Sequence, residues 1–126
     1  MDIQQEMLDH VGRRAKEQGV DNIVPNCADA HELPFADGSF DAAYLVTALG
    51  EIPDPARTLA ELRRVLKPFG RLVVGEFFDR HQIRPSSLIS LVGLTCQYTN
   101  RGVLVQGSEI TINLTTTRHL MAGGRQ

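Results

Sequence analysis

The 126-residue sequence is poor in the residue types that mark specialised classes of protein. It has no tryptophan, four scattered histidines and only two cysteines, Cys27 and Cys96, which stand far apart and outside any Cys/His cluster. A metal site is therefore not expected, because structural zinc needs closely spaced cysteine and histidine ligands. Both thiols are expected to be reduced in a cytoplasmic protein.

Excess charge and long apolar runs are scarce as well. The net charge of −2 at pH 7 gives no reason to expect binding to nucleic acid or to an acidic membrane surface. The longest apolar candidate, residues 88–94, is far shorter than the roughly 20 residues that cross a bilayer. The first ten residues lack the basic and apolar regions of a signal peptide. The length fits one domain.

The apolar pattern predicts helices that alternate with strands, which indicates an α/β fold with a mainly parallel sheet. The run over 40–46 is nearly continuously apolar, as is typical of a strand buried on both faces. The last two strands form either a hairpin around Asn100–Gly102 or a longer excursion. The predicted elements are helices over 3–18, 55–67 and 86–93 and strands over 22–26, 40–46, 71–78, 94–99 and 109–117.

An ordered series of short motifs occupies residues 29–76. An acid followed by Ala-x-x-Leu-Pro-Phe begins at Asp29, and the motifs Ser-Phe-Asp, Asp-Pro and Leu-Lys-Pro-x-Gly follow at Ser39, Asp54 and Leu66. This run resembles the middle of a class I S-adenosylmethionine-dependent methyltransferase. It is most similar to the small-molecule branch that includes the quinone-biosynthesis C-methyltransferases.

The resemblance implies a Rossmann-like class I methyltransferase sheet that is incomplete at its N-terminus. The family's first two strands and its glycine-rich turn would precede residue 1, so residues 1–126 are expected to form a single partial methyltransferase domain. Phe69 is a second departure, because the family usually has glycine there. A phenylalanine in a turn that requires positive φ would be strained.

The resemblance assigns S-adenosylmethionine-binding roles to four positions. Asp2 would accept hydrogen bonds from the ribose hydroxyls, and Asp29 would accept one from the adenine amino group. The N–H of Ala30 would meet a ring nitrogen, and Thr47 would lie near the sulfonium and the substrate. Local alternatives stay open: Asp2 can form a capping box with Gln5, Asp29 can bond its own loop, and Thr47 can be a satisfied loop hydroxyl.

The implied function is S-adenosylmethionine-dependent methyl transfer to a small-molecule acceptor. Such a displacement at an activated sulfonium depends largely on alignment and desolvation, so the sequence identifies no catalytic residue. The alternative is a non-catalytic or truncated methyltransferase-like chain that needs a partner or an upstream segment to bind the cofactor. A nicotinamide-binding Rossmann domain is less favoured, because no G-x-G-x-x-G follows a strand.

Without two central strands, the predicted strands 22–26 and 40–46 lack their neighbours in the family's sheet. Exposed strand edges are normally paired or covered. Either these two strands pair with each other, a second chain supplies the edge, or residues 1–26 detach. The chain is therefore expected to be a homo-oligomer or partly molten, to bind the cofactor weakly and to have little activity alone.

Overall fold

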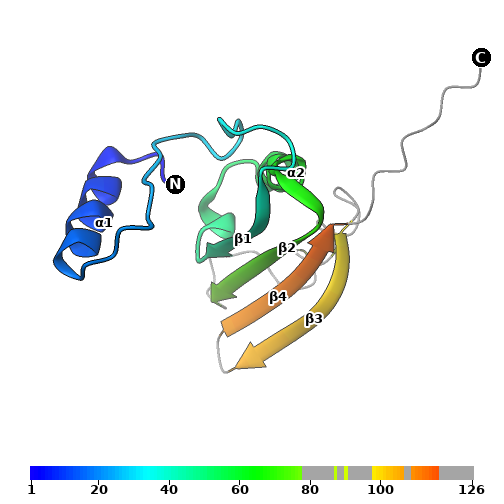
Figure 1. The fold of residues 1–126 in the computed structure, drawn as a ribbon. Coiled ribbons are helices and arrows are strands. Elements are labelled where there is room, and N and C mark those ends of the chain that lie inside the picture. Colours follow the sequence, from blue (N-terminus) through cyan, green and yellow to red (C-terminus); the bar gives the residue numbers. More distant parts are fainter. Residues whose placement is uncertain (78–86, 88–89, 91–97, 107–108, 117–126) are drawn as a thin grey trace, which may run out of the picture. The chain divides into compact units, whose positions relative to one another are not determined.

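The computed structural model describes residues 1–77, 87, 90, 98–106 and 109–116, so the helix predicted over 86–93 lies almost wholly outside the described residues. The chain divides into two compact units, Met1–Pro34 and Phe35–Gln126. The first unit contains helix α1 (Gln5–Glu17). The second, drawn with it in Figure 1, contains β1 (Phe40–Val46), the 3₁₀ turn η1 (Leu49–Glu51), α2 (Pro55–Val65), β2 (Leu66–Phe77), β3 (Tyr98–Gln106) and β4 (Glu109–Thr116).

Helix α1 confirms the first predicted helix, although it begins two residues later than expected. The N–H of Gly19 donates to the carbonyl of Lys16, which closes the helix where the sequence places its stop. Of the helix's own residues only Leu8 is buried, whereas Met7 and Val11 on the same apolar stripe are exposed. The amphipathic pattern therefore forms a helix whose apolar stripe is largely open to solvent.

The strand predicted over 22–26 is wrong. This segment has no strand geometry, and the nearest pairing is one isolated parallel bridge between Asp2 and Cys27. Pro25 contributes to this result, because proline has no N–H to donate to a ladder.

The second unit is built on a four-stranded sheet in the order β1-β2-β4-β3. Strands β1 and β2 are parallel, whereas β4 is antiparallel to both β2 and β3. The α/β class is confirmed, and so is a strand near 109–117, whereas the sheet that was predicted as mainly parallel is mixed over the described residues, with one parallel and two antiparallel pairings. The hairpin predicted around Asn100–Gly102 is wrong, because β3 runs through these residues and pairs with β4 on both sides of them.

Helix α2 supplies the core of the second unit. Its predicted start is confirmed: Asp54 Oδ1 accepts a hydrogen bond from the N–H of Arg57 at 3.0 Å, and Pro55 occupies the first turn. The helix ends at Val65, two residues before the predicted end, because Leu66 already has extended dihedrals. The core combines helix residues with residues of β2 and η1, all buried: Leu49, Leu59, Leu62, Val65, Leu66, Leu72 and Val74.

Strand β1 forms as predicted, but the expectation that both of its faces are buried is wrong. Ala43 and Leu45 align with the buried Leu72 and Val74 of β2, which places them on the covered face. On the opposite face Tyr44 is 78% exposed, and its neighbours there are exposed too. A continuous apolar run therefore does not by itself identify a strand covered on both sides.

A bulge at the start of β2 accommodates the Lys-Pro-Phe-Gly segment. Phe40 pairs with Leu66 and Ala42 with Arg71, so β2 carries three residues more than β1 over this interval. The predicted strain is confirmed, because Phe69 has a φ of 65°. Glycine is needed at position 70 because the backbone of Lys67 comes close to it: a Cβ on residue 70 would lie 2.8 Å from the carbonyl oxygen of Lys67.

The side chain of Arg64 fixes the loop before β1 to helix α2. Its guanidinium donates to Glu61, to Asp37 and to the carbonyl of Phe35, each at 2.8 Å. The hydrogen bonds with Glu61 and Asp37 raise the pKa of Arg64 above its usual range, so this cation stays charged at every pH at which the fold persists. The loop is thus held by a permanent charge.

Substitutions at the bulge should separate strain from close packing. We expect Phe69→Gly to be neutral or to stabilise the fold by up to about 1 kcal/mol, because relief of the left-handed backbone exceeds the entropy that glycine adds. We expect Gly70→Ala to destabilise it by roughly 1–3 kcal/mol, because the added methyl group meets backbone. Urea titrations of both variants measure the difference, and a less stable Phe69→Gly would show that the ring is an anchor.

Thr58 carries a buried hydroxyl that should weaken the core. It is 1% exposed, and Oγ1 has no hydrogen-bond partner among the described residues. We expect Thr58→Val to raise the free energy of unfolding by about 1 kcal/mol, because the uncompensated desolvation of the hydroxyl disappears. Thr58→Ser keeps the hydroxyl and serves as the control. Equal stabilities of the valine variant and the native chain would indicate that the hydroxyl is satisfied.

Candidate functional site

The N-terminal segment lies beside residues 26–28 through main-chain hydrogen bonds. The N–H of Asp2 donates to the carbonyl of Asn26 at 3.2 Å, and the N–H of Ala28 donates to the carbonyl of Asp2 at 3.1 Å. These two bonds form the parallel bridge between Asp2 and Cys27. One of the predicted site residues is thereby held next to the segment that leads into another, Asp29.

Asp2 does not form the capping box that its local alternative required. Its Oδ1 accepts from the N–H of Gln4 at 2.9 Å, and the helix begins only at Gln5. The side chain of Gln5 instead donates to Asp9, one helical turn further along. The capping-box interpretation is therefore wrong, whereas the ribose-binding role of Asp2 stays a prediction.

Asp29 is engaged with His31 two residues further along the loop. Its Oδ1 accepts from the backbone N–H of His31 at 2.8 Å and lies 2.8 Å from His31 Nδ1. The loop alternative for Asp29 is thus confirmed, although the carboxylate is still 53% exposed. The contact joins the first and last residues of the sequence Asp29-Ala30-His31, and we did not predict it from the sequence. Ala30 lies between the two residues, half-buried in the turn.

Thr47 directly follows β1 and has a strained backbone conformation. Its φ is 49°, an unusual value for a β-branched residue. The N–H of Thr47 donates to the carbonyl of Gly75 in β2 at 2.8 Å, and its hydroxyl donates to the carbonyl of Val46. The predicted loop hydroxyl bond is therefore present. The strain falls at the carboxyl end of a parallel strand, where open α/β sheets bind their ligands.

Three of the predicted site residues share one unit. Asp2, Asp29 and Ala30 belong to Met1–Pro34, and the bridge at Cys27 joins the two segments that carry them. Thr47 belongs to the second unit, Phe35–Gln126. In the part of the chain that the structure describes, no three His, Cys, Asp or Glu side chains gather as metal ligands would.

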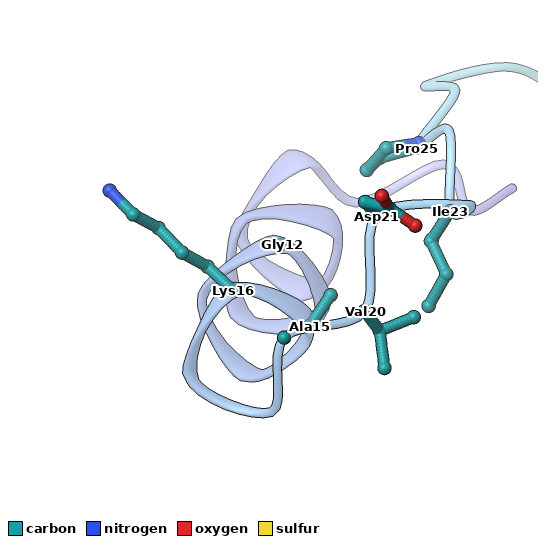
Figure 2. Close-up of a pocket in the computed structure, with 8 residues that line it drawn as sticks. Gly12, Ala15, Lys16, Val20, Asp21, Ile23 and Pro25 are labelled. Atoms are coloured by element: carbon teal, nitrogen blue, oxygen red, sulfur yellow. The ribbon is translucent and has the colours of Figure 1, made fainter.

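A separate hollow of about 340 Å³ lies between α1 and the segment that follows it. Figure 2 shows Ala15 on the helix and Val20, Ile23 and Pro25 on the returning segment, with the amino group of Lys16 directed away. None of the predicted cofactor residues lines this hollow. Its lining is mostly aliphatic and offers few groups that would orient a polar ligand, so it does not form part of the predicted site.

Comparison with known proteins gives the family. A family model described as "Methyltransferase domain" matches residues 1–74, more than half of the chain. The chain belongs to the class I S-adenosylmethionine-dependent methyltransferases. The matched residues include α1, the Asp29 loop, β1, α2 and the first part of β2.

The relatives of this methyltransferase-family chain include enzymes of quinone biosynthesis. A demethylmenaquinone methyltransferase of Clavibacter sepedonicus is 46% identical over 76 residues, which make up 60% of this chain and 30% of that protein. A ubiquinone/menaquinone biosynthesis C-methyltransferase of Rickettsia bellii is 40% identical over 81 residues, 60% of this chain and 31% of that protein. The matched part of the chain thus spans about a third of the length of these relatives.

Solved structures agree on the fold. A SAM-dependent methyltransferase from Aquifex aeolicus superposes with a TM-score of 0.80 at 18% identity, covering 91% of this chain and 66% of that one. The [4+2]-cyclase SpnF superposes equally well, also with a TM-score of 0.80 and 18% identity, covering 91% of this chain and 64% of that one. Because one of these proteins is named as a methyltransferase and the other as a cyclase, the fold by itself does not fix the reaction.

The strain at Thr47 gives a prediction about the stability of this methyltransferase-family chain. We expect Thr47→Gly to raise the free energy of unfolding by about 1 kcal/mol, because glycine adopts positive φ without steric cost. Thr47→Val retains the branching but loses the hydroxyl, and it should be less stable than the native chain. Urea titration followed by circular dichroism measures both. A destabilised glycine variant would contradict strain at this position.

Proposed function

We propose that this chain binds S-adenosylmethionine and takes part in methyl transfer to a small-molecule acceptor. The observation that carries the proposal is the main-chain bridge between Asp2 and Cys27, which joins two acid-bearing segments of a methyltransferase-family chain within one unit. The quinone-type methyltransferases among the relatives support a small, largely apolar acceptor.

The residues of the first unit offer a chemistry that fits the adenosine part of the cofactor. The Asp29 carboxylate accepts from His31 and remains half-exposed, and a carboxylate can accept up to about four hydrogen bonds, so a further donor such as the adenine amino group is compatible. Ala30 provides an adjacent backbone N–H for a ring nitrogen. Asp2 provides a second carboxylate for the ribose hydroxyls.

The reaction requires little from the protein beyond placing the cofactor and the acceptor correctly. S-Adenosylmethionine, when bound, supplies a methyl group already activated by the positive sulfur. Thr47 lies at the carboxyl end of β1, and an acceptor placed there would need only to be aligned with the methyl group and shielded from water. A base is needed only for an acceptor that must lose a proton, and the described residues nominate none.

A second candidate is a methyltransferase-like chain that binds the cofactor only with a partner or an additional segment. The exposed outer face of β1 favours this second candidate, because apolar side chains that stay open to solvent show that this face of the strand is incompletely covered. The two candidates differ in one measurement. The first expects the purified chain to bind S-adenosylhomocysteine, no tighter than about the micromolar range, and the second expects no binding by the chain alone.

The adenine contact can be tested at Asp29. We expect Asp29→Ala to weaken binding of S-adenosylhomocysteine about 5- to 150-fold, because an unpaired buried donor costs roughly 1–3 kcal/mol. Titration calorimetry at high protein concentration measures the change. Asp21→Ala removes an exposed acid of the same unit and is the matched control. Equal loss in both variants, or unchanged binding in Asp29→Ala, would exclude Asp29 from the site.

A further inference from the structure

Asp29 and His31 form a tight local arrangement within the unit Met1–Pro34. The backbone N–H of His31 donates to Asp29 Oδ1 at 2.8 Å, and Nδ1 of the same histidine lies 2.8 Å from the same oxygen. The main chain closes this turn as well, because the N–H of Glu32 donates to the carbonyl of Asp29 at 3.1 Å. Side chain and main chain together therefore fix the direction of the Asp29 carboxylate.

The two side chains of this pair differ in their exposure to solvent. The side chain of His31 is 18% exposed, whereas that of Asp29 is 53% exposed. The imidazole is thus largely covered, and the carboxylate that it contacts is open. A covered ring beside an open carboxylate can hold the carboxylate in one direction while the exposed part of the carboxylate meets a ligand.

The contact also determines which nitrogen of a neutral His31 carries the proton. A neutral imidazole has one N–H and one nitrogen lone pair. A lone pair on Nδ1 would face the lone pairs of the Asp29 carboxylate at 2.8 Å, so the proton belongs on Nδ1 and the lone pair on Nε2. A histidine without such a partner prefers the proton on Nε2, and the contact therefore has a signature that can be measured.

We propose that His31 is a positioning residue of the adenosine site, and that it holds the Asp29 carboxylate in the direction that accepts the 6-amino group of adenine. This inference rests on the proposed binding of S-adenosylmethionine, and it adds a residue to which the family resemblance assigns no role. A carboxylate accepts up to about four hydrogen bonds, so acceptance from His31 is compatible with acceptance from the amino group. His31 acts through Asp29 and has no need to touch the cofactor.

A carboxylate that is held in place distinguishes adenine from hypoxanthine. The 6-amino group of adenine donates to a carboxylate, whereas the 6-oxo group of hypoxanthine can only accept and would face the carboxylate's lone pairs. A carboxylate on a freely rotating side chain would turn away from the oxo group at little cost. By holding Asp29, His31 therefore raises the selectivity of the site for the amino base.

Titration calorimetry of the whole chain with S-adenosylhomocysteine and its 6-oxo analogue, S-inosylhomocysteine, tests the proposal. We expect His31→Leu to weaken binding of S-adenosylhomocysteine about 3- to 10-fold, because Asp29 loses a donor that orients it, and to leave binding of the analogue unchanged or tighter. His31→Asn places an amide N–H at the position of Nδ1 and should keep the native affinity. His10→Leu removes an exposed histidine of the same unit and is the matched control.

Nitrogen-15 NMR of the cofactor-free chain tests the contact without any ligand. At about pH 8, where histidine side chains are ordinarily neutral, the proton of His31 should be on Nδ1, and Asp29→Ala should return it to Nε2. A native chain with the proton on Nε2 would overturn the inference whatever its affinity for the cofactor.

The binding data separate this inference from the proposed function. A native chain that does not bind S-adenosylhomocysteine would overturn the proposed binding by this chain, and the inference with it. Native binding that His31→Leu leaves unchanged, or that His31→Leu and His31→Asn weaken equally, would overturn the inference alone. An equal loss of affinity for the 6-amino and the 6-oxo ligand in His31→Leu would do the same, because it would indicate a purely structural role.

Discussion

The parallel pairing of β1 with β2 is the constraint on which the second unit depends. It aligns Ala43 and Leu45 with Leu72 and Val74, so that one apolar face lies with the buried side chains of α2. It also brings the N–H of Thr47 to Gly75, which holds a strained residue at the carboxyl end of the strand. Core and candidate substrate position both follow from one register.

The chain's sequence predicts this unit well where local chemistry decides. Asp54 and Pro55 begin α2 as expected, because capping depends on a few neighbouring residues. Phe69 has positive φ as expected, since the turn motif requires it. The prediction that both faces of β1 are buried is wrong for a different reason. An apolar run shows what a strand can bury, whereas the neighbours on each face decide what it does bury.

The sequence nominates the residues of the candidate site, but it does not predict the contacts that they make. The Leu-Pro-Phe motif pointed to Asp29, but the bond from His31 depends on the local turn of the loop. The strand expected over 22–26 is absent, yet one bridge at Cys27 still holds Asp2 against this segment. Local spacing thus nominates the candidate residues, and three-dimensional pairing decides how they are held.

The direct passage from α2 into β2 has a consequence for how the chain folds. Helix α2 ends at Val65 and β2 begins at Leu66, so β1, α2 and β2 form one nearly continuous stretch of sequence. Contacts between residues close in sequence form quickly, because little chain entropy is lost in closing short loops. Strand β4 pairs with β2 over sequence separations of 32 to 44 residues, compared with 26 to 29 residues between β1 and β2, whereas β3 and β4 pair over separations as short as three residues. We therefore expect the β3–β4 hairpin and the β1–α2–β2 stretch to form early, and the pairing of β2 with β4 to complete the sheet.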